Sequence, residues 1–180
     1  MSNEFASSPY TAGQLNAMVK LMKKQEGDDA PERFLRGELQ FVTIKHVIDL
    51  DADPFVPDGW AVEEHQRGGS FEWSPEKVSL FLTEEQSNGS YNQGNDLRKK
   101  LEGSNPFNAN CLDYLLAHPD LIPDEWKGKW AFFWGTIYRH SFGDLCVRCL
   151  RWDGDEWDWY CYWLDDGFRG RNPSAVPART

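Results

Sequence analysis

Four cysteines are the residues of this sequence best suited to chemistry. Cys146 and Cys149 have the C-x-x-C spacing of zinc knuckles and redox pairs, in which both thiols converge from a turn or a helix N-terminus. Here the motif falls within a stretch that alternates like a strand, so the two side chains should point to opposite faces. Cys146 and Cys161 should instead be diagonal neighbours on one face. We therefore expect buried free thiols, Cys111 included, and predict no metal site and no cofactor.

A catalytic site would have to assemble from residues far apart in the sequence. Cys111 is a candidate nucleophile, His118 and His140 are candidate bases, and Asp144 could orient a histidine. Their spacings match no catalytic motif. A hydrolase built from these residues is therefore an alternative, and a non-enzymatic protein is the leading hypothesis.

The chain is acidic, with a formal net charge of −10 over 180 residues, and its N-terminal half is the more acidic one. Such a field repels nucleic acid and anionic lipid, so neither is expected as a partner. The sequence shows no secretory leader and no apolar run of membrane-spanning length, which predicts a cytoplasmic location. An acidic inhibitor encoded by a mobile element is a further alternative.

Carboxylates gather near the C-terminal end of the chain, where oxygen ligands could hold a calcium ion. The twelve-residue pattern of a calcium loop is missing, so a solvated acidic turn is the expected role. The residues are Asp153, Asp155, Glu156, Asp158, Asp165 and Asp166.

Aromatic residues are the most prominent feature, with nine Trp, eleven Phe and six Tyr. They alternate through residues 129–164, which predicts a three-stranded antiparallel meander with turns at Phe142-Gly143 and Gly154-Asp155. This register pairs Phe133 with Trp152, and Trp152 with Trp157. Its core face should hold Phe133, Ile137, Leu150, Trp152, Trp157, Trp159 and Trp163. Its second face should hold Trp134, Tyr138, Val147, Arg151, Asp158, Tyr160 and Tyr162.

The second face is the candidate binding surface, because aromatic side chains with polar tips are typical of protein-binding hot spots. An alternative is that Trp134, Tyr138 and Tyr160 form a stacking platform for a carbohydrate or small molecule, and another is that helices cover the face. The leading hypothesis is a binding protein with a protein partner, whose oligomeric state is open. The candidate residues are Trp134, Tyr138, Arg151, Asp158, Tyr160 and Tyr162.

The surrounding elements predict an α+β fold, with closure into a small barrel as an alternative. Helical spacing and capping signals predict an N-terminal helical pair, in which the first helix ends at about Glu26 and the second runs through Leu35. The same signals predict two short helices over 95–102 and 111–117. Alternation predicts strands over 38–50 and 60–66, whereas 77–83 is ambiguous. The polar segment between 88 and 95 suggests a boundary between an acidic module, 1–88, and a meander module, 95–180, with a single domain as the alternative.

The sequence from Asn108 to Trp152 resembles a family of short uncharacterised bacterial proteins. The resemblance is carried by the string FFWGTIYR, which is followed by a glycine turn and then by VR. The family is associated mainly with candidate-phylum and metagenomic genomes. No activity is assigned to it. The resemblance therefore implies a bacterial protein and carries no site residues over.

Overall fold

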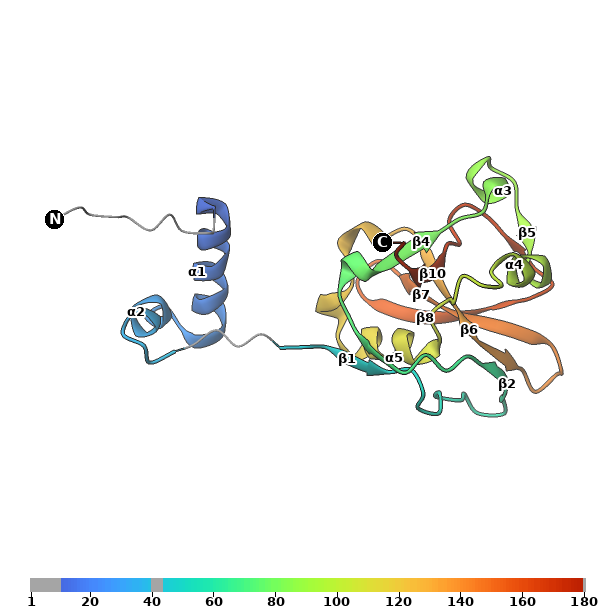
Figure 1. The fold of residues 1–180 in the computed structure, drawn as a ribbon, viewed down its shortest axis with the longest axis horizontal. Helices are drawn as coiled ribbons and strands as arrows, with labels where there is room; N and C mark the ends of the chain where they lie inside the picture. Colours follow the sequence, from blue (N-terminus) through green and yellow to red (C-terminus); the bar gives the residue numbers. More distant parts are fainter. Residues whose placement is uncertain (1–10, 40–43, 180) are drawn as a thin grey trace. The chain divides into compact units, whose positions relative to one another are not determined.

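The chain divides into two compact units between Ile44 and Lys45 (Figure 1). The structure is a computed structural model, which describes residues 11–39 and 44–179. The boundary that the sequence predicts falls between residues 88 and 95. That segment lies inside the second unit, where β5, Asn92–Gln93, pairs with β9, Gly167–Phe168. None of the helices in the described residues is both long and apolar enough to cross a membrane.

The first unit contains the predicted helical pair, α1 (Ala12–Glu26) and α2 (Ala30–Leu35). Thr11 begins α1 with a capping box, in which its hydroxyl accepts from the backbone of Gln14 and the Gln14 side chain accepts from the backbone of Thr11. Gly27, with φ of 98°, ends the helix. These local signals explain why the pair could be predicted.

The second unit is built on one mixed sheet with the order β4-β10-β6-β7-β8, to which β2 adds by pairing with β6. Only the β10–β6 pair is parallel among these described strands. The sheet ends at β4 and at β8, so it does not close into a barrel. The strands are β2 (Ala61–His65), β4 (Val78–Phe81), β6 (Trp130–Arg139), β7 (Leu145–Trp152), β8 (Trp157–Trp163) and β10 (Ser174–Pro177).

A separate two-stranded ribbon pairs β1, Val47–Asp49, with β3, Ser70–Glu72. The strand predicted over 38–50 is thus much too long, because its partner offers only three residues. Residues 40–43 of that prediction lie outside the described residues. The α+β class is nevertheless confirmed. The strand predicted over 60–66 is present in shortened form, and the ambiguous segment 77–83 contains a strand at Val78–Phe81.

Helices pack against both faces of the meander. On one face, Leu112 and Leu115 pack in the cluster that contains Phe133. On the other face, Leu97 of α4 and Leu101, which follows α4, pack in the cluster that contains Trp134. The helices are α3 (Glu84–Ser87), α4 (Gly94–Lys100) and α5 (Ala109–Ala117), with short 3-10 turns at Pro75–Lys77, Pro119–Leu121 and Asp124–Trp126.

The predicted meander register is confirmed for β7 and β8, where Trp152 is opposite Trp157, and it is wrong for β6. Phe132 is opposite Cys149, and the register then shifts before Ile137. Two features cause the difference. The β6–β7 turn spans residues 140–144, so the predicted two-residue loop at Phe142-Gly143 is wrong. At Gly135, the N–H donates to Phe107 O at 3.0 Å and the carbonyl accepts from Gln66 N at 2.7 Å. The backbone there bonds to other segments instead of β7.

The shift moves two side chains to the faces opposite those predicted. Ile137 packs with Trp134, and Tyr138 packs with Cys146 on the face covered by α5. The two residues had been assigned by strict alternation, which an irregularity within the strand interrupts.

Candidate functional site

Strand β8 forms one border of the sheet, and among the described strands only β7 pairs with it. Hydrogen bonds at its two ends show which residues of β8 direct their backbone groups toward β7. Leu164 N donates to Leu145 O at 2.9 Å, and Asp153 N donates to Glu156 O at 3.1 Å. Because antiparallel pairs alternate, every second residue between these ends directs its N–H and C=O away from β7. The outward residues are Trp157, Trp159, Cys161 and Trp163.

Some of the outward groups already have partners. The N–H of Trp159 donates to the carboxylate of Asp158 at 2.7 Å, and the carbonyl of Trp163 accepts from Asp166 N at 3.0 Å. For the N–H group of Trp157, the described part of the chain supplies no hydrogen bond, and the N–H of Cys161 has only its own thiol sulfur as a partner. An unpaired strand edge of this kind can pair with another chain.

Aromatic side chains flank this edge on both faces. Trp159 and Trp163 are half-buried on the α5 face, and Tyr160 on the other face is 44 % exposed. Tyr160 stacks with the guanidinium of Arg151, whose Cζ is 4.8 Å from the ring centroid. Arg151 in turn lies 3.5 Å from Asp158. The edge therefore combines open backbone groups with wide apolar side chains.

A second group of aromatic residues lies beside the end of β8, at the β6–β7 turn and at the start of β2. His140 lies between Trp60 and Trp163, with a centroid distance of 5.2 Å to each ring. Phe142 packs on His140 and is 86 % exposed. Phe55, whose ring centroid lies 5.2 Å from Arg148 Cζ, is 55 % exposed. Exposed apolar groups gathered in this way are typical of an interaction surface.

A buried ion pair holds the α5 face of the site in place. Arg148 of β7 is fully buried and makes two hydrogen bonds to Asp113 of α5, at 2.7 and 3.1 Å. Its guanidinium also stacks on Trp159, with Cζ 4.4 Å from the ring centroid. One arginine thus fixes the positions of α5, β7 and a Trp of β8 relative to one another.

The six predicted binding residues do not form one surface. Trp134 and Tyr138 are both buried and lie on opposite faces, and Tyr138 Oη donates to Phe55 O at 3.0 Å. The platform of Trp134, Tyr138 and Tyr160 is therefore not assembled. The remaining residues, which share the face beside the open edge, are Arg151, Asp158, Tyr160 and Tyr162.

Alternation in the sequence predicts the two faces of the meander but does not show that β8 has an open edge. Phe55 and Phe142 were also missed as binding candidates, although a Phe in a turn is an unusual choice for a solvated loop. That anomaly was the signal available in the sequence.

The residues of the hydrolase alternative lie apart. Cys111 is fully buried in the α5 core, and burial raises the pKa of its thiol, which disfavours the nucleophilic thiolate. His118 packs on Tyr114, with a centroid distance of 4.5 Å. His140 and Asp144 are joined through their backbones, N–H to carbonyl at 2.9 Å. Within the described residues, no hydrogen bond links Cys111 to a histidine.

The cysteines of the C-x-x-C motif lie on opposite faces of β7, as predicted: Cys149 packs with Val147, and Cys146 packs with Tyr138. Cys161 is a diagonal neighbour of Cys146 on the α5 face and is only half-buried, unlike the other three thiols. The Cys146 thiol donates to the sulfur of Cys161, which lowers the pKa of Cys161 and raises that of Cys146.

We expect Cys161 to be the fastest cysteine to alkylate, and Cys146→Ala to slow its reaction several-fold near neutral pH. A lowered pKa gives Cys161 a larger thiolate fraction below its ordinary pKa, and the thiolate is the reactive form. The replacement should move the rate profile to higher pH. Iodoacetamide labelling followed by mass spectrometry across a pH series measures this, with Cys149→Ala as the control on the opposite face. Superimposable profiles for the wild type and Cys146→Ala would contradict the thiol pairing.

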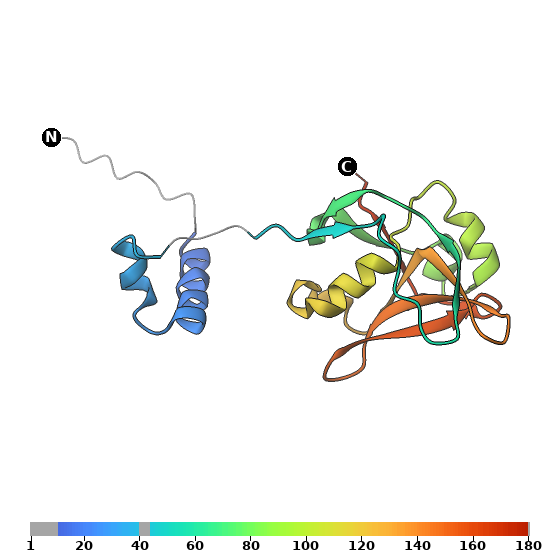
Figure 2. The ribbon, with the colours of Figure 1, turned by 90° about the horizontal axis from the view of Figure 1, so that it is seen from below.

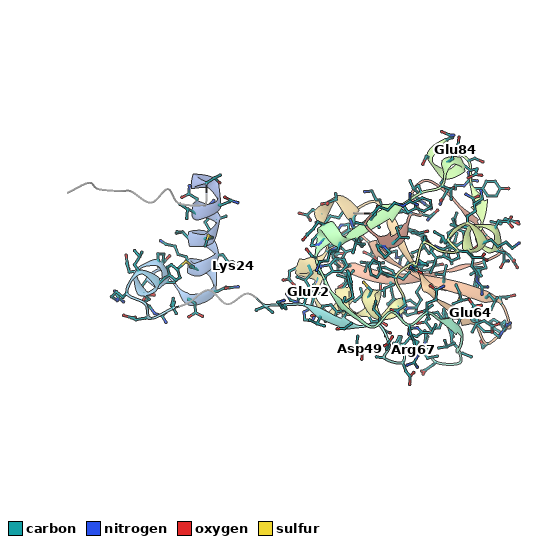
Figure 3. The ribbon with its side chains drawn as sticks, in the orientation of Figure 1. Lys24, Asp49, Glu64, Arg67, Glu72 and Glu84 are labelled. Atoms are coloured by element: carbon teal, nitrogen blue, oxygen red, sulfur yellow. The ribbon has the colours of Figure 1, made fainter. Side chains whose placement is uncertain are left out.

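A hollow of about 360 Å³ lies at the other side of β6, between β2 and α4. Trp134 reaches its lining, and the indole N–H of Trp134 has no partner within the described residues. The only arginine in the lining, Arg98, is paired with Glu64, which is labelled in Figure 3. A polar hollow whose cation is already neutralised offers little to a ligand, so we base no function on it.

The fold and the edge together define an α+β protein with a mixed sheet that is open at β8. Comparisons of the chain with protein-family models, with curated proteins and with solved structures each find no match. The family resemblance over Asn108 to Trp152 therefore stays a prediction, and the geometry of the site is the basis for a proposed function.

Proposed function

We propose that this protein is a non-enzymatic binding protein that takes an extended segment of a partner protein as an additional strand beside β8. The observation that carries the proposal is the outward row of backbone groups on β8, in which the N–H of Trp157 has no partner among the described residues and the N–H of Cys161 meets only its own thiol. Strand addition is a common mode of peptide recognition, in which backbone hydrogen bonds supply affinity and flanking side chains supply specificity.

The side chains around the edge suit this role. Trp and Tyr are enriched at binding hot spots because they bury much apolar area and lose little conformational freedom. Trp159 is held by Arg148 before any partner arrives, which reduces the entropy lost on binding. The incoming strand would place alternate side chains on the Trp face and on the face of Tyr160 and Tyr162.

Selection of extended peptides from a displayed library of unbiased composition tests the proposal. We expect bound peptides to lose most of their affinity for Cys161→Pro and to keep it for Cys161→Ala. The proline removes an outward N–H and its ring obstructs the edge, whereas no bond to β7 is lost, and proline is tolerated at such positions of edge strands. An unchanged unfolding transition confirms that the proline variant is folded.

Trp157→Pro provides a second obstruction of the same edge, because Trp157 is the first residue of β8 and its N–H also points outward. Its matched control is Trp157→Phe. If the selected peptides bind both proline variants as well as their controls, the partner does not use the edge and the proposed function is wrong. A library that yields no binders at all leads to the same conclusion.

A further inference from the structure

Carboxylates lie at both ends of the open edge. Asp153, Asp155 and Glu156 form the exposed β7–β8 turn, and Asp165 and Asp166 form the turn that follows β8. Among the described residues, none of these five makes an ion pair. Figure 2 shows the β7–β8 turn protruding from the second unit, away from its helices. The edge therefore has an unneutralised acidic group at each end.

The basic residues nearest to the edge do not cancel this charge. Arg148 is buried and paired with Asp113. Arg151 lies beside Asp158, and Lys127, which stacks over Trp152, pairs with Asp124 at 2.7 Å. Each of these three cations is thus committed to a carboxylate other than those of the two turns. Arg171 stacks over Trp130, which packs on Tyr160 and Tyr162, and among the described residues it makes no ion pair with the turn carboxylates.

We propose that the segment bound along β8 is basic at both ends and apolar in the middle, an inference that rests on the proposed function. The seven residues of β8 span about 23 Å at the usual rise of a strand, so the two basic groups are separated by about seven residues. Lysine or arginine at these positions meets the acidic turns, and the residues between them lie over the Trp and Tyr side chains. Complementary charge at the rim of an interface also speeds association and fixes the register of the incoming chain.

The same charges argue against a second copy of this chain as the occupant. Antiparallel pairing of two β8 strands would place the 153–156 turn of one copy beside the 165–166 turn of the other. Parallel pairing would place each turn beside its own equivalent. Both arrangements bring carboxylates together, and like charges facing each other across paired strands are destabilising.

Peptides with a common apolar core, flanked at each end by two lysines, two serines or two glutamates, test the charge of the occupant. The core is taken from the edge-dependent binders of the library. We expect the lysine peptide to bind tightest and the glutamate peptide weakest, with the difference shrinking as salt is added. In the protein, neutralising the β7–β8 turn with Asp153→Asn, Asp155→Asn and Glu156→Gln should weaken the lysine peptide about tenfold and leave the serine peptide unchanged.

A matched control removes three exposed carboxylates elsewhere in the same unit. Glu76→Gln, Glu84→Gln and Glu102→Gln remove the same amount of negative charge. Glu76 and Glu84 flank β4 at the opposite border of the sheet and Glu102 follows α4, so the three replacements should change the affinity for the lysine peptide little. If the control weakens binding as much as the turn variant does, only the overall charge matters and the inference is wrong.

The two proposals fail in different ways. If peptides depend on the edge but bind equally well with lysine, serine or glutamate ends, the inference of a basic partner is wrong and strand addition is still supported. Peptides that are insensitive to the proline variants overturn strand addition itself.

Discussion

Replacing Asp113 with Ala is expected to lower the free energy of unfolding of the second unit by about 3 to 5 kcal/mol. The replacement leaves the Arg148 guanidinium, which is 1 % exposed, without its carboxylate. An uncompensated buried charge is far more costly than the loss of one contact, since the charge cannot return to water while the fold persists. Urea denaturation followed by tryptophan fluorescence measures the change.

Two further variants separate the burial of charge from the loss of packing. Glu63→Ala breaks the partly exposed ion pair with Arg139 and is expected to cost about 0 to 1 kcal/mol. The double replacement Asp113→Leu with Arg148→Met removes both charges and should recover most of the stability lost in Asp113→Ala. If Asp113→Ala costs no more than Glu63→Ala, the pair is not an anchor of the site.

Gly135→Ala is expected to destabilise the second unit by at least about 1 to 3 kcal/mol. A Cβ at this position would lie 2.6 Å from the carbonyl oxygen of Pro106 and 2.8 Å from the backbone nitrogen of Asn108. These are backbone atoms, which cannot move aside as the end of a flexible side chain does. Thermal and urea unfolding measure the loss.

Gly13→Ala is the control, because the nearest atom to a Cβ there is Thr11 Oγ1 at 3.9 Å. It lies in α1, where Ala is preferred to Gly, and should leave the unfolding of the second unit unchanged. A Gly135→Ala protein as stable as the wild type would show that the irregular part of β6 does not pass as close to residues 106–108 as the structure places it.

Elements with local signals could be predicted from the sequence. Thr11 and Gln14 mark the start of α1, and Gly154 places the turn that brings Trp152 opposite Trp157. The irregularity of β6 could not be predicted, because it depends on bonds from Gly135 to Phe107 and Gln66, which are distant in the sequence. The place of β10 in the sheet also depends on such long-range pairing.

The site could be predicted only in part. The aromatic meander directed attention to the correct segment, and Arg151, Asp158, Tyr160 and Tyr162 do share a face. The burial of Trp134 depends on how α4 and Phe168 pack, which alternation within the meander does not determine. That β8 is left as an edge follows from the order of all the strands, and a single strand pattern does not contain that information.

The position of β10 between β4 and β6 has a consequence for how the chain acquires its structure during synthesis. The meander strands are neighbours in sequence and can pair as soon as residues 130–163 have left the ribosome. β4 is made much earlier, yet it joins the sheet through β10, whose residues are 174–177. The apolar side chains of β4 therefore lack the strand that joins them to the sheet while nearly a hundred further residues are synthesised. A chaperone that covers this strand would act in that interval.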